Sequence, residues 1–189
     1  MPSLSEADSN ALLQLARDSV ISAVSSGCLP ALVPQKEVFS QKCGVFVTVY
    51  VNHRLRGCIG VIEGDESLGD GVVRCAACAA LQDPRFPPLR PEELDDMQIQ
   101  ISLLSPLAPI LAGEIEIGRH GLMVALGRQR GVLLPQVATD HNLTVEEFLA
   151  ETCRKAGLAP GAWRGPETQI FGFTCEAFSD GIRAATKAN

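Results

Sequence analysis

The sequence predicts an α+β fold built on an internal duplication, and three observations lead to this prediction. Runs rich in β-branched residues alternate with segments of helical spacing, so both element types are expected. The order hairpin, helix, strand occurs twice, over about 44–105 and about 115–178. The Arg-Gly pair at 56–57 falls opposite the one at 130–131 when the two halves are aligned. Because each half is too small to bury its sheet alone, we expect one domain over residues 1–189, with a shared, mostly antiparallel sheet flanked by helices.

An N-terminal helix is predicted over residues 4–26. Ser5 and Asp8 resemble a capping box, leucines and alanines recur at helical spacing, and Gly27 can end the helix. Residues 28–41 hold two prolines and no clear period, which predicts a loop.

The first repeat is predicted as a hairpin, a helix and a strand. Residues 44–51 (GVFVTVYV) read as a strand, Asn52 and His53 as a turn, and residues 55–61 as the returning strand. Small apolar residues at helical spacing predict a helix over 68–81. The alternation over 97–103 predicts a strand with one solvated face.

The second repeat is predicted in the same order. Residues 122–126 and 131–134 are expected to pair as strands, with Pro135 ending the second of them. Thr144 and Glu147 form a capping box that opens a helix to about Ala156, and Gly157 is a plausible stop. A final strand is expected over 169–178.

The composition is that of an acidic, folded protein. Of the 189 residues, 46% are hydrophobic and 20% are charged, which is typical of soluble domains. The net charge of −6 argues against binding to nucleic acid or to anionic membranes, because both need a basic face. The N-terminus lacks the features of a secretory signal and no apolar run could span a bilayer, so we expect a cytoplasmic protein. In that compartment the seven cysteines are expected to be free thiols.

The LRGCIG segment at residues 55–60 is the sharpest functional feature. Gly57 and Gly60 bracket Cys58 inside a predicted strand, and glycines there mark a bulge or a close approach to the backbone. Arg56 precedes Cys58 by two positions, and a nearby cation stabilises the thiolate that a nucleophile needs. This spacing predicts Cys58 as a reactive thiol and Arg56 as its anion or thiolate stabiliser, if no bulge separates their faces.

A structural interpretation of Cys58 stays open beside the functional one. Val132 stands at the matching position of the second half, which indicates that a small buried hydrophobe is acceptable there. Cys75 and Cys78 have the CxxC spacing of metal and redox sites, but no second ligand pair accompanies them. They lie among alanines of a predicted helix, so packing is the favoured interpretation, and it is also favoured for Cys153. We expect no metal and no cofactor.

Two further segments carry candidate site residues. His120 stands between glycines at the entry to a predicted strand, and is the candidate for proton transfer with Cys58. Its neighbour Arg119 is a candidate binding residue, as are Gly57 and Gly60. Arg85, in the DPRF segment at 83–86, either clamps an anionic group or holds a helix-stop loop through Asp83. His53 and His141 are interpreted as surface turn residues.

Taken together, these segments resemble the AMMECR domain family. The pieces that carry the resemblance, in the family's order, are GVFVT at 44–48, LRGCIG at 55–60, DPRF at 83–86, ISLL at 101–104, GRHGL at 118–122 and LLPQVA at 133–138. The length is more similar to the prokaryotic form, called AmmeMemoRadiSam system protein A. The resemblance implies an α+β fold with an internal duplication, and a Memo-like protein and a radical SAM protein as partners. It also implies a functional LRGCIG segment, and supplies no established reaction.

Two functions therefore stay open. In the first, the protein is an enzyme or enzyme subunit that acts on an unknown small molecule or peptide, with Cys58, Arg56 and His120 in the roles given above. In the second, it is a non-catalytic binding module in which the hairpin and the Pro-rich loop at 84–91 form a groove for a partner protein.

Overall fold

The computed structural model describes residues 4–28 and 36–181. The chain forms two compact units: unit 1 comprises Met1–Leu104 and Glu176–Asn189, and unit 2 comprises Ser105–Cys175. Part of the loop expected over 28–41 lies outside the described residues, and the part that is described includes a short 3-10 helix, η1 (Glu37–Ser40), that the sequence interpretation missed.

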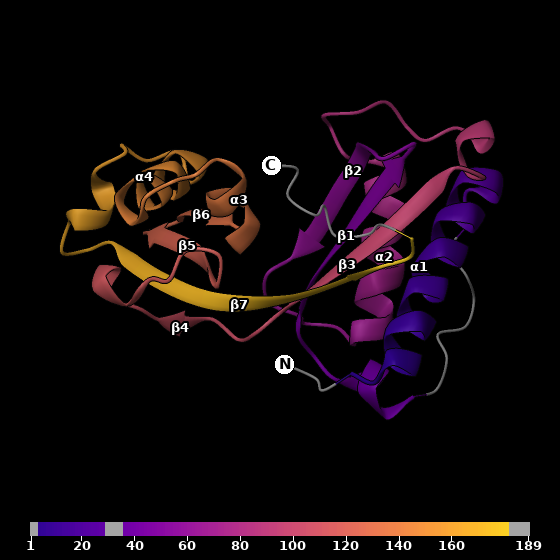
Figure 1. Cartoon of the computed structure of the whole chain (residues 1–189), viewed down its shortest axis with the longest axis horizontal. Coiled ribbons are helices and arrows are strands. Elements are labelled where there is room, and N and C mark those ends of the chain that lie inside the picture. The colour runs from indigo at the N-terminus through magenta and orange to yellow at the C-terminus, as the bar shows by residue number, and fades with distance from the viewer. Residues whose placement is uncertain (1–3, 29–35, 182–189) are drawn as a thin grey trace. The chain divides into compact units, whose positions relative to one another are not determined.

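Unit 1 consists of a sheet and two long helices (Figure 1). Its elements are α1 (Glu6–Ser26), η1, β1 (Gly44–Val51), β2 (Arg54–Val61), α2 (Leu68–Leu81), η2 (Pro91–Glu93), β3 (Met97–Leu104) and the last residues of β7 (Gln169–Ser179). The strand order is β2-β1-β3, followed by the end of β7, and β1 is antiparallel to both of its neighbours. The prediction of an α+β fold with antiparallel strands is confirmed.

Local sequence signals account for the ends of these elements. Ser5 and Asp8 form the expected capping box, and Gly27 closes α1 in the left-handed conformation with a φ of 70°. Asn52 and His53 both have positive φ, which is the geometry of the tight hairpin turn expected between β1 and β2. The structure begins α1 at Glu6, two residues later than predicted, because Ser5 is its cap.

The core of unit 1 lies between its sheet and its helices. Alternate residues of β1 and β3 pack against the apolar faces of α1 and α2 in one cluster, which includes Val45, Val47, Val49, Ile99, Ile101, Leu12, Leu15, Val72 and Ala76. The small residues of α2 let the helix approach the strands closely.

Unit 2 repeats the order hairpin, helix, strand. Its elements are β4 (Ala108–Pro109), η3 (Ala112–Glu114), β5 (His120–Leu126), β6 (Gln129–Leu133), α3 (Pro135–Asp140), α4 (Val145–Lys155), η4 (Ala162–Arg164) and the first part of β7. The strand order is β6-β5-β7-β4, and the described pairs are antiparallel. The two units share this element order, while the duplication itself and its boundaries stay predictions.

One expectation for unit 2 is wrong. Pro135 does not end a buried strand but opens α3, occupying a first-turn position of that helix. A proline fits there because its fixed φ suits the helix and its missing N–H is not needed in the first turn. The short elements β4 and η3 were also missed. In contrast, the capping box of Thr144 and Glu147 opens α4 as predicted.

Among residues 4–28 and 36–181, we find no helix with both the length and the apolar character needed to cross a membrane.

Candidate functional site

Cys58 lies in β2, opposite Thr48 of β1. Its side chain is half-buried, and the Thr48 hydroxyl donates a hydrogen bond to the Cys58 Sγ at 3.2 Å. The Cys58 Sγ is thus the acceptor of this hydrogen bond. The register therefore gives the Cys58 thiol one polar partner inside the hairpin.

A β-bulge separates Arg56 from the simple alternation of β2. Val49 pairs with Gly57 while Tyr50 pairs with Leu55, so Arg56 is left without a cross-strand partner. Strand alternation would place Arg56 and Cys58 on one face of the strand only if no bulge separated them, and the structure has a bulge at this point. A bulge re-aims the side chain that it carries, and here this side chain turns to the Pro-rich loop.

The Arg56 guanidinium anchors the Pro-rich loop to the hairpin. Its Nε and Nη2 donate to the two carboxylate oxygens of Glu93 at 2.7 and 2.9 Å, and its Nη1 donates to the Pro87 carbonyl at 2.8 Å. Both side chains of the pair are only 15% exposed. The hydrogen bonds from Arg56 lower the pKa of Glu93 to about 2, so the pair is fully charged at neutral pH. The charge of Arg56 is therefore matched by Glu93, and its predicted role as stabiliser of the Cys58 thiolate stays a prediction.

Asp83 ties the DPRF segment to the outer edge of β2. Its buried carboxylate accepts the Cys58 backbone N–H at 2.9 Å and the Arg85 Nε and Nη2 at 3.0 and 2.6 Å. The Arg85 guanidinium, with its side chain 55% exposed, also lies 3.5 Å from the Cys58 carbonyl oxygen. These hydrogen bonds, above all those from Arg85, hold the pKa of Asp83 well below its ordinary value. The structure thus contains the Asp83–Arg85 interaction that was one of the two interpretations of this segment, and Arg85 keeps an exposed side beside Cys58.

Asp83 is a site residue that the sequence interpretation did not select. The sequence separates it from Cys58 by 25 positions, and the contact depends on how the loop after α2 folds back onto β2. The available signal was the DPRF segment itself, which places a carboxylate two residues before an arginine.

Close packing against the rest of unit 1 explains why residues 57 and 60 are glycines. A side chain at Gly57 would overlap the Ala79 carbonyl of α2, and one at Gly60 would overlap the Phe46 ring on the neighbouring strand. Both glycines thus permit a close approach, as predicted, and the approaching groups are the protein's own. Their contribution to ligand binding stays a prediction.

Unit 2 also has two glycines in close contacts. A side chain at Gly131 would overlap the backbone of α4 near Ala156, and one at Gly121 would overlap the Phe173 ring. Gly131 aligns with Gly57, whereas Gly121 lies in the first strand of its hairpin and Gly60 in the second strand of its own, so this second pair does not correspond.

His120 begins β5, and its ring is held by the preceding turn. The Glu116 backbone N–H donates to the His120 Nδ1 at 3.0 Å, so the proton of the neutral ring resides on Nε2. Arg119 forms an exposed ion pair with the Glu116 carboxylate at 2.9 Å. His120 and Arg119 belong to unit 2, whereas Cys58, Arg56 and Arg85 belong to unit 1. The pairing of His120 with Cys58 stays a prediction.

Beside Arg56, unit 1 has a surface hollow of about 500 Å³. We call it the hairpin–loop hollow, and its lining residues are Arg56, Phe86, Pro87, Pro88, Arg90 and Glu93. Pro87 and Pro88 are exposed and Phe86 is half-buried. The hollow therefore combines an apolar surface with the ion pair that fixes the loop.

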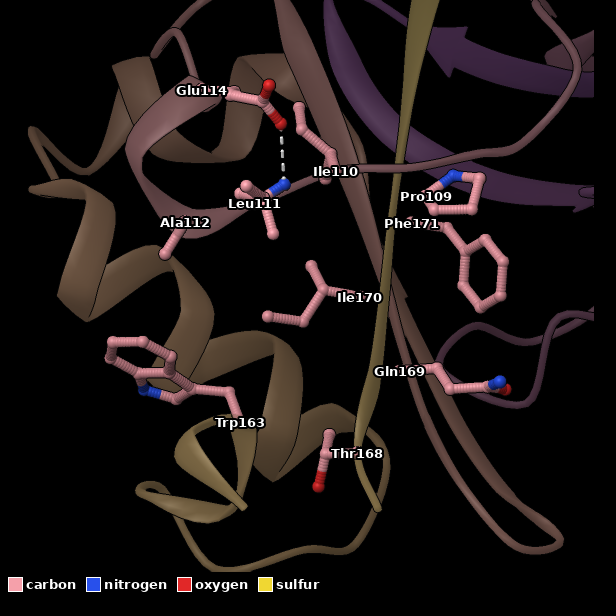
Figure 2. Close-up of a pocket in the computed structure, with 10 residues that line it drawn as sticks. All are labelled: Pro109, Ile110, Leu111, Ala112, Glu114, Trp163, Thr168, Gln169, Ile170 and Phe171. Atoms are coloured by element: carbon pink, nitrogen blue, oxygen red, sulfur yellow. Dashed lines mark hydrogen bonds between the residues drawn. The ribbon is translucent and has the colours of Figure 1, made fainter. Parts of the chain in front are cut away.

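A second hollow, of about 670 Å³, lies in unit 2 beside β7 (Figure 2). Figure 2 shows Ile170 and Trp163 facing the same space as Leu111, while Phe171 and Gln169 point to the other side of β7. The indole N–H of Trp163 is buried without a hydrogen-bond partner among the described residues. None of the site residues predicted from the sequence lines this hollow.

Packing is the interpretation of Cys75, Cys78 and Cys153. All seven cysteines are free thiols, and Cys75 and Cys153 are fully buried. Burial raises the pKa of Cys75 to about 11, so this thiol is protonated at neutral pH. Within the described part of the chain, His, Cys, Asp and Glu side chains do not gather in groups of three or more that could hold a metal ion.

Comparison with known proteins reveals clear relatives. The profile of the AMMECR1 family matches residues 13–178. A protein of Methanothermobacter thermautotrophicus is 44% identical over 151 residues, which cover 76% of this chain and 79% of that protein. A protein of Aquifex aeolicus is 39% identical over 181 residues, covering 92% of this chain and 93% of that protein. The crystal structure of the uncharacterized protein PH0010 from Pyrococcus horikoshii has a TM-score of 0.85 and 36% identity, and the match covers 90% of each chain.

The fold is that of an α+β protein, and its candidate site is the strand in which Gly57 and Gly60 flank Cys58. Two ion pairs, Arg56–Glu93 and Arg85–Asp83, hold the neighbouring loop against this strand. The chain belongs to the AMMECR1 family.

Proposed function

We propose that the protein is a binding module whose docking surface is the hairpin–loop hollow. The observation that carries the proposal is that Arg56 fixes two exposed prolines and a half-buried phenylalanine in one place through Glu93 and the Pro87 carbonyl. An apolar surface that is rigid before binding loses little conformational freedom when a partner covers it. The family resemblance suggests a Memo-like protein and a radical SAM protein as the partners.

The test is binding of each purified partner to the protein and to its Arg90→Glu variant. Arg90 lines the hollow with its side chain 69% exposed and forms ion pairs with Glu92 and Glu93. Its charge reversal should weaken binding by about ten-fold, and circular dichroism checks that the variant keeps its fold. Arg128→Glu, the same change at an exposed arginine in the turn between β5 and β6, serves as the matched control. Binding of neither partner, or equal binding by both variants and the unmodified protein, would contradict the proposal.

A reactive Cys58 thiol is the second candidate, because the Thr48 hydroxyl donates to its sulfur. In this function Cys58 is the nucleophile, Arg56 stabilises an anion and His120 moves a proton. Because the Glu116 backbone N–H occupies Nδ1, any proton that His120 exchanges in this function has to pass through Nε2.

We expect iodoacetamide to alkylate Cys58 faster at neutral pH than Cys28, although Cys28 is the more exposed thiol. Thr48→Val should slow the reaction at Cys58 by about ten-fold, because it removes the hydrogen bond that the reacting sulfur accepts, and should leave Cys28 unaffected. Site-resolved mass spectrometry measures both rates in one sample. A Cys58 that reacts more slowly than Cys28 in the folded protein would rule out this candidate.

A further inference from the structure

Unit 2 has a hollow of about 500 Å³ that neither proposed function uses. It lies between the end of β6, α3 and the second half of α4, and we call it the α3–α4 hollow. Its lining residues are Leu133, Val137, His141, Leu143, Glu151, Arg154 and Lys155. The volume falls within the range of pockets that take small ligands.

The floor of the α3–α4 hollow is aliphatic. Leu133, Val137 and Leu143 are all half-buried and pack against the core cluster of unit 2. Because they are held by the core, the floor is present before any ligand arrives. A hydrocarbon chain placed on it would remove apolar surface from water on both sides.

The rim of the hollow is cationic in a protein of net charge −6. The single acidic lining residue, Glu151, is already paired with Arg154. Lys155 is exposed and has no ion-pair partner within residues 4–28 and 36–181. A cationic ligand would thus find no free carboxylate among the lining residues, whereas an anionic one would find the Lys155 ammonium and a possible donor in the His141 ring.

The position of these cations has a partial structural explanation. Arg154 and Lys155 lie in the last turn of α4, where basic residues complement the negative end of the helix. That effect accounts for their charge, but it does not account for the aliphatic hollow that the same side chains border. The combination of an aliphatic floor and an unmatched cation is what an amphipathic acid requires.

We propose that the α3–α4 hollow binds a carboxylate that carries an aliphatic body. The aliphatic part lies on Leu133, Val137 and Leu143, and the carboxylate is at the rim beside Lys155. Such a carboxylate has two possible sources, a free carboxylic acid or the C-terminus of a peptide that ends in an aliphatic residue.

The experiment follows the methyl resonances of leucine and valine by NMR while sodium octanoate or octanol is added. Octanoate should shift the methyl resonances of the floor in a saturable way, and octanol should bind about two- to five-fold more weakly, the contribution of one exposed ion pair. Lys155→Gln should weaken the binding of octanoate by the same factor and leave the binding of octanol unchanged. Lys42→Gln, the same change at an exposed lysine of unit 1, is the matched control.

A second arm distinguishes the two sources. A short peptide ending in leucine is compared as the free acid and as the amide. Tighter binding of the free-acid peptide than of octanoate supports the proposal and identifies a chain end, and the reverse order supports it and identifies a small acid. Shifts that are not saturable, or equal binding of octanoate and octanol that Lys155→Gln does not change, would overturn the proposal.

Discussion

Replacing Gly57 by alanine is expected to lower the free energy of unfolding by about 3 kcal/mol, the upper part of the usual range for overpacking. The added Cβ would overlap the carbonyl of Ala79, which is backbone in the last turn of α2 and cannot turn aside as a side chain could. Either α2 must move away from β2 or the hairpin must bend, and both changes open the core of unit 1. Gly131→Ala should have a similar effect in unit 2, because its Cβ would meet the backbone of α4.

Chemical denaturation followed by circular dichroism measures this effect. The matched control is Gly113→Ala, because a Cβ at Gly113 meets no atom within 4 Å. We expect the control to change the free energy of unfolding by no more than about 0.5 kcal/mol. If Gly57→Ala were as stable as Gly113→Ala, the close packing of α2 on β2 would have to be abandoned.

The second large effect is expected at Asp83. Asp83→Asn keeps the size of the side chain but removes the charge that accepts hydrogen bonds from the Cys58 N–H and from Arg85. Because Asp83 is 4% exposed, the loss is not replaced by water, and we expect a decrease in the free energy of unfolding of about 2–3 kcal/mol at neutral pH. This figure includes only a small contribution from the Asp83–Arg85 ion pair, because the Arg85 side chain is 55% exposed and water screens its charge.

The difference in the free energy of unfolding between the wild type and Asp83→Asn should depend on pH. The pKa of Asp83 is lower in the folded protein than its ordinary value of 3.8, so the charged carboxylate stabilises the fold at every pH above that value. The stabilisation is lost as the pH falls below 3.8 toward the folded-state pKa. Urea unfolding between neutral pH and pH 3 should therefore show the wild type and Asp83→Asn converging at the acid end.

Asp65→Asn is the control for Asp83→Asn, because Asp65 is an exposed carboxylate with no hydrogen bond or ion pair in the part of the chain that the structure describes. Its substitution should change the free energy of unfolding by less than about 0.5 kcal/mol. A difference between wild type and Asp83→Asn that grew as the pH fell would contradict the assigned role of Asp83.

The elements that the sequence predicted correctly depend on neighbouring residues. Ser5 with Asp8 and Thr144 with Glu147 form capping boxes within a single helical turn, and these pairs fixed the starts of α1 and α4. By contrast, α3 has only six residues and no side-chain cap at Leu134, so neither periodicity nor capping indicated it. A short helix of this kind depends on its packing rather than on its own sequence.

The candidate site was predicted only in part, because its contacts join residues that are far apart in the sequence. The LRGCIG and DPRF segments were both selected, but the contacts that connect them join residues far apart in the sequence. Arg56 meets Glu93 across 37 positions, and only the bulge beside Gly57 turns Arg56 toward it. Strand register and loop conformation decide such contacts, and a single sequence determines neither directly.

The two ends of unit 2 lie next to each other in space. The Ser105 backbone N–H donates to the Thr174 carbonyl at 3.0 Å, and the Thr174 N–H donates to the Ser105 hydroxyl at 2.9 Å. Residues 105–175 are thus an insertion between β3 and the last residues of β7 whose entry and exit are hydrogen-bonded to each other. A segment whose two ends adjoin can be replaced by one of another length without separating the strand ends that flank it, so residues 105–175 mark a point where this fold can accept a different insert.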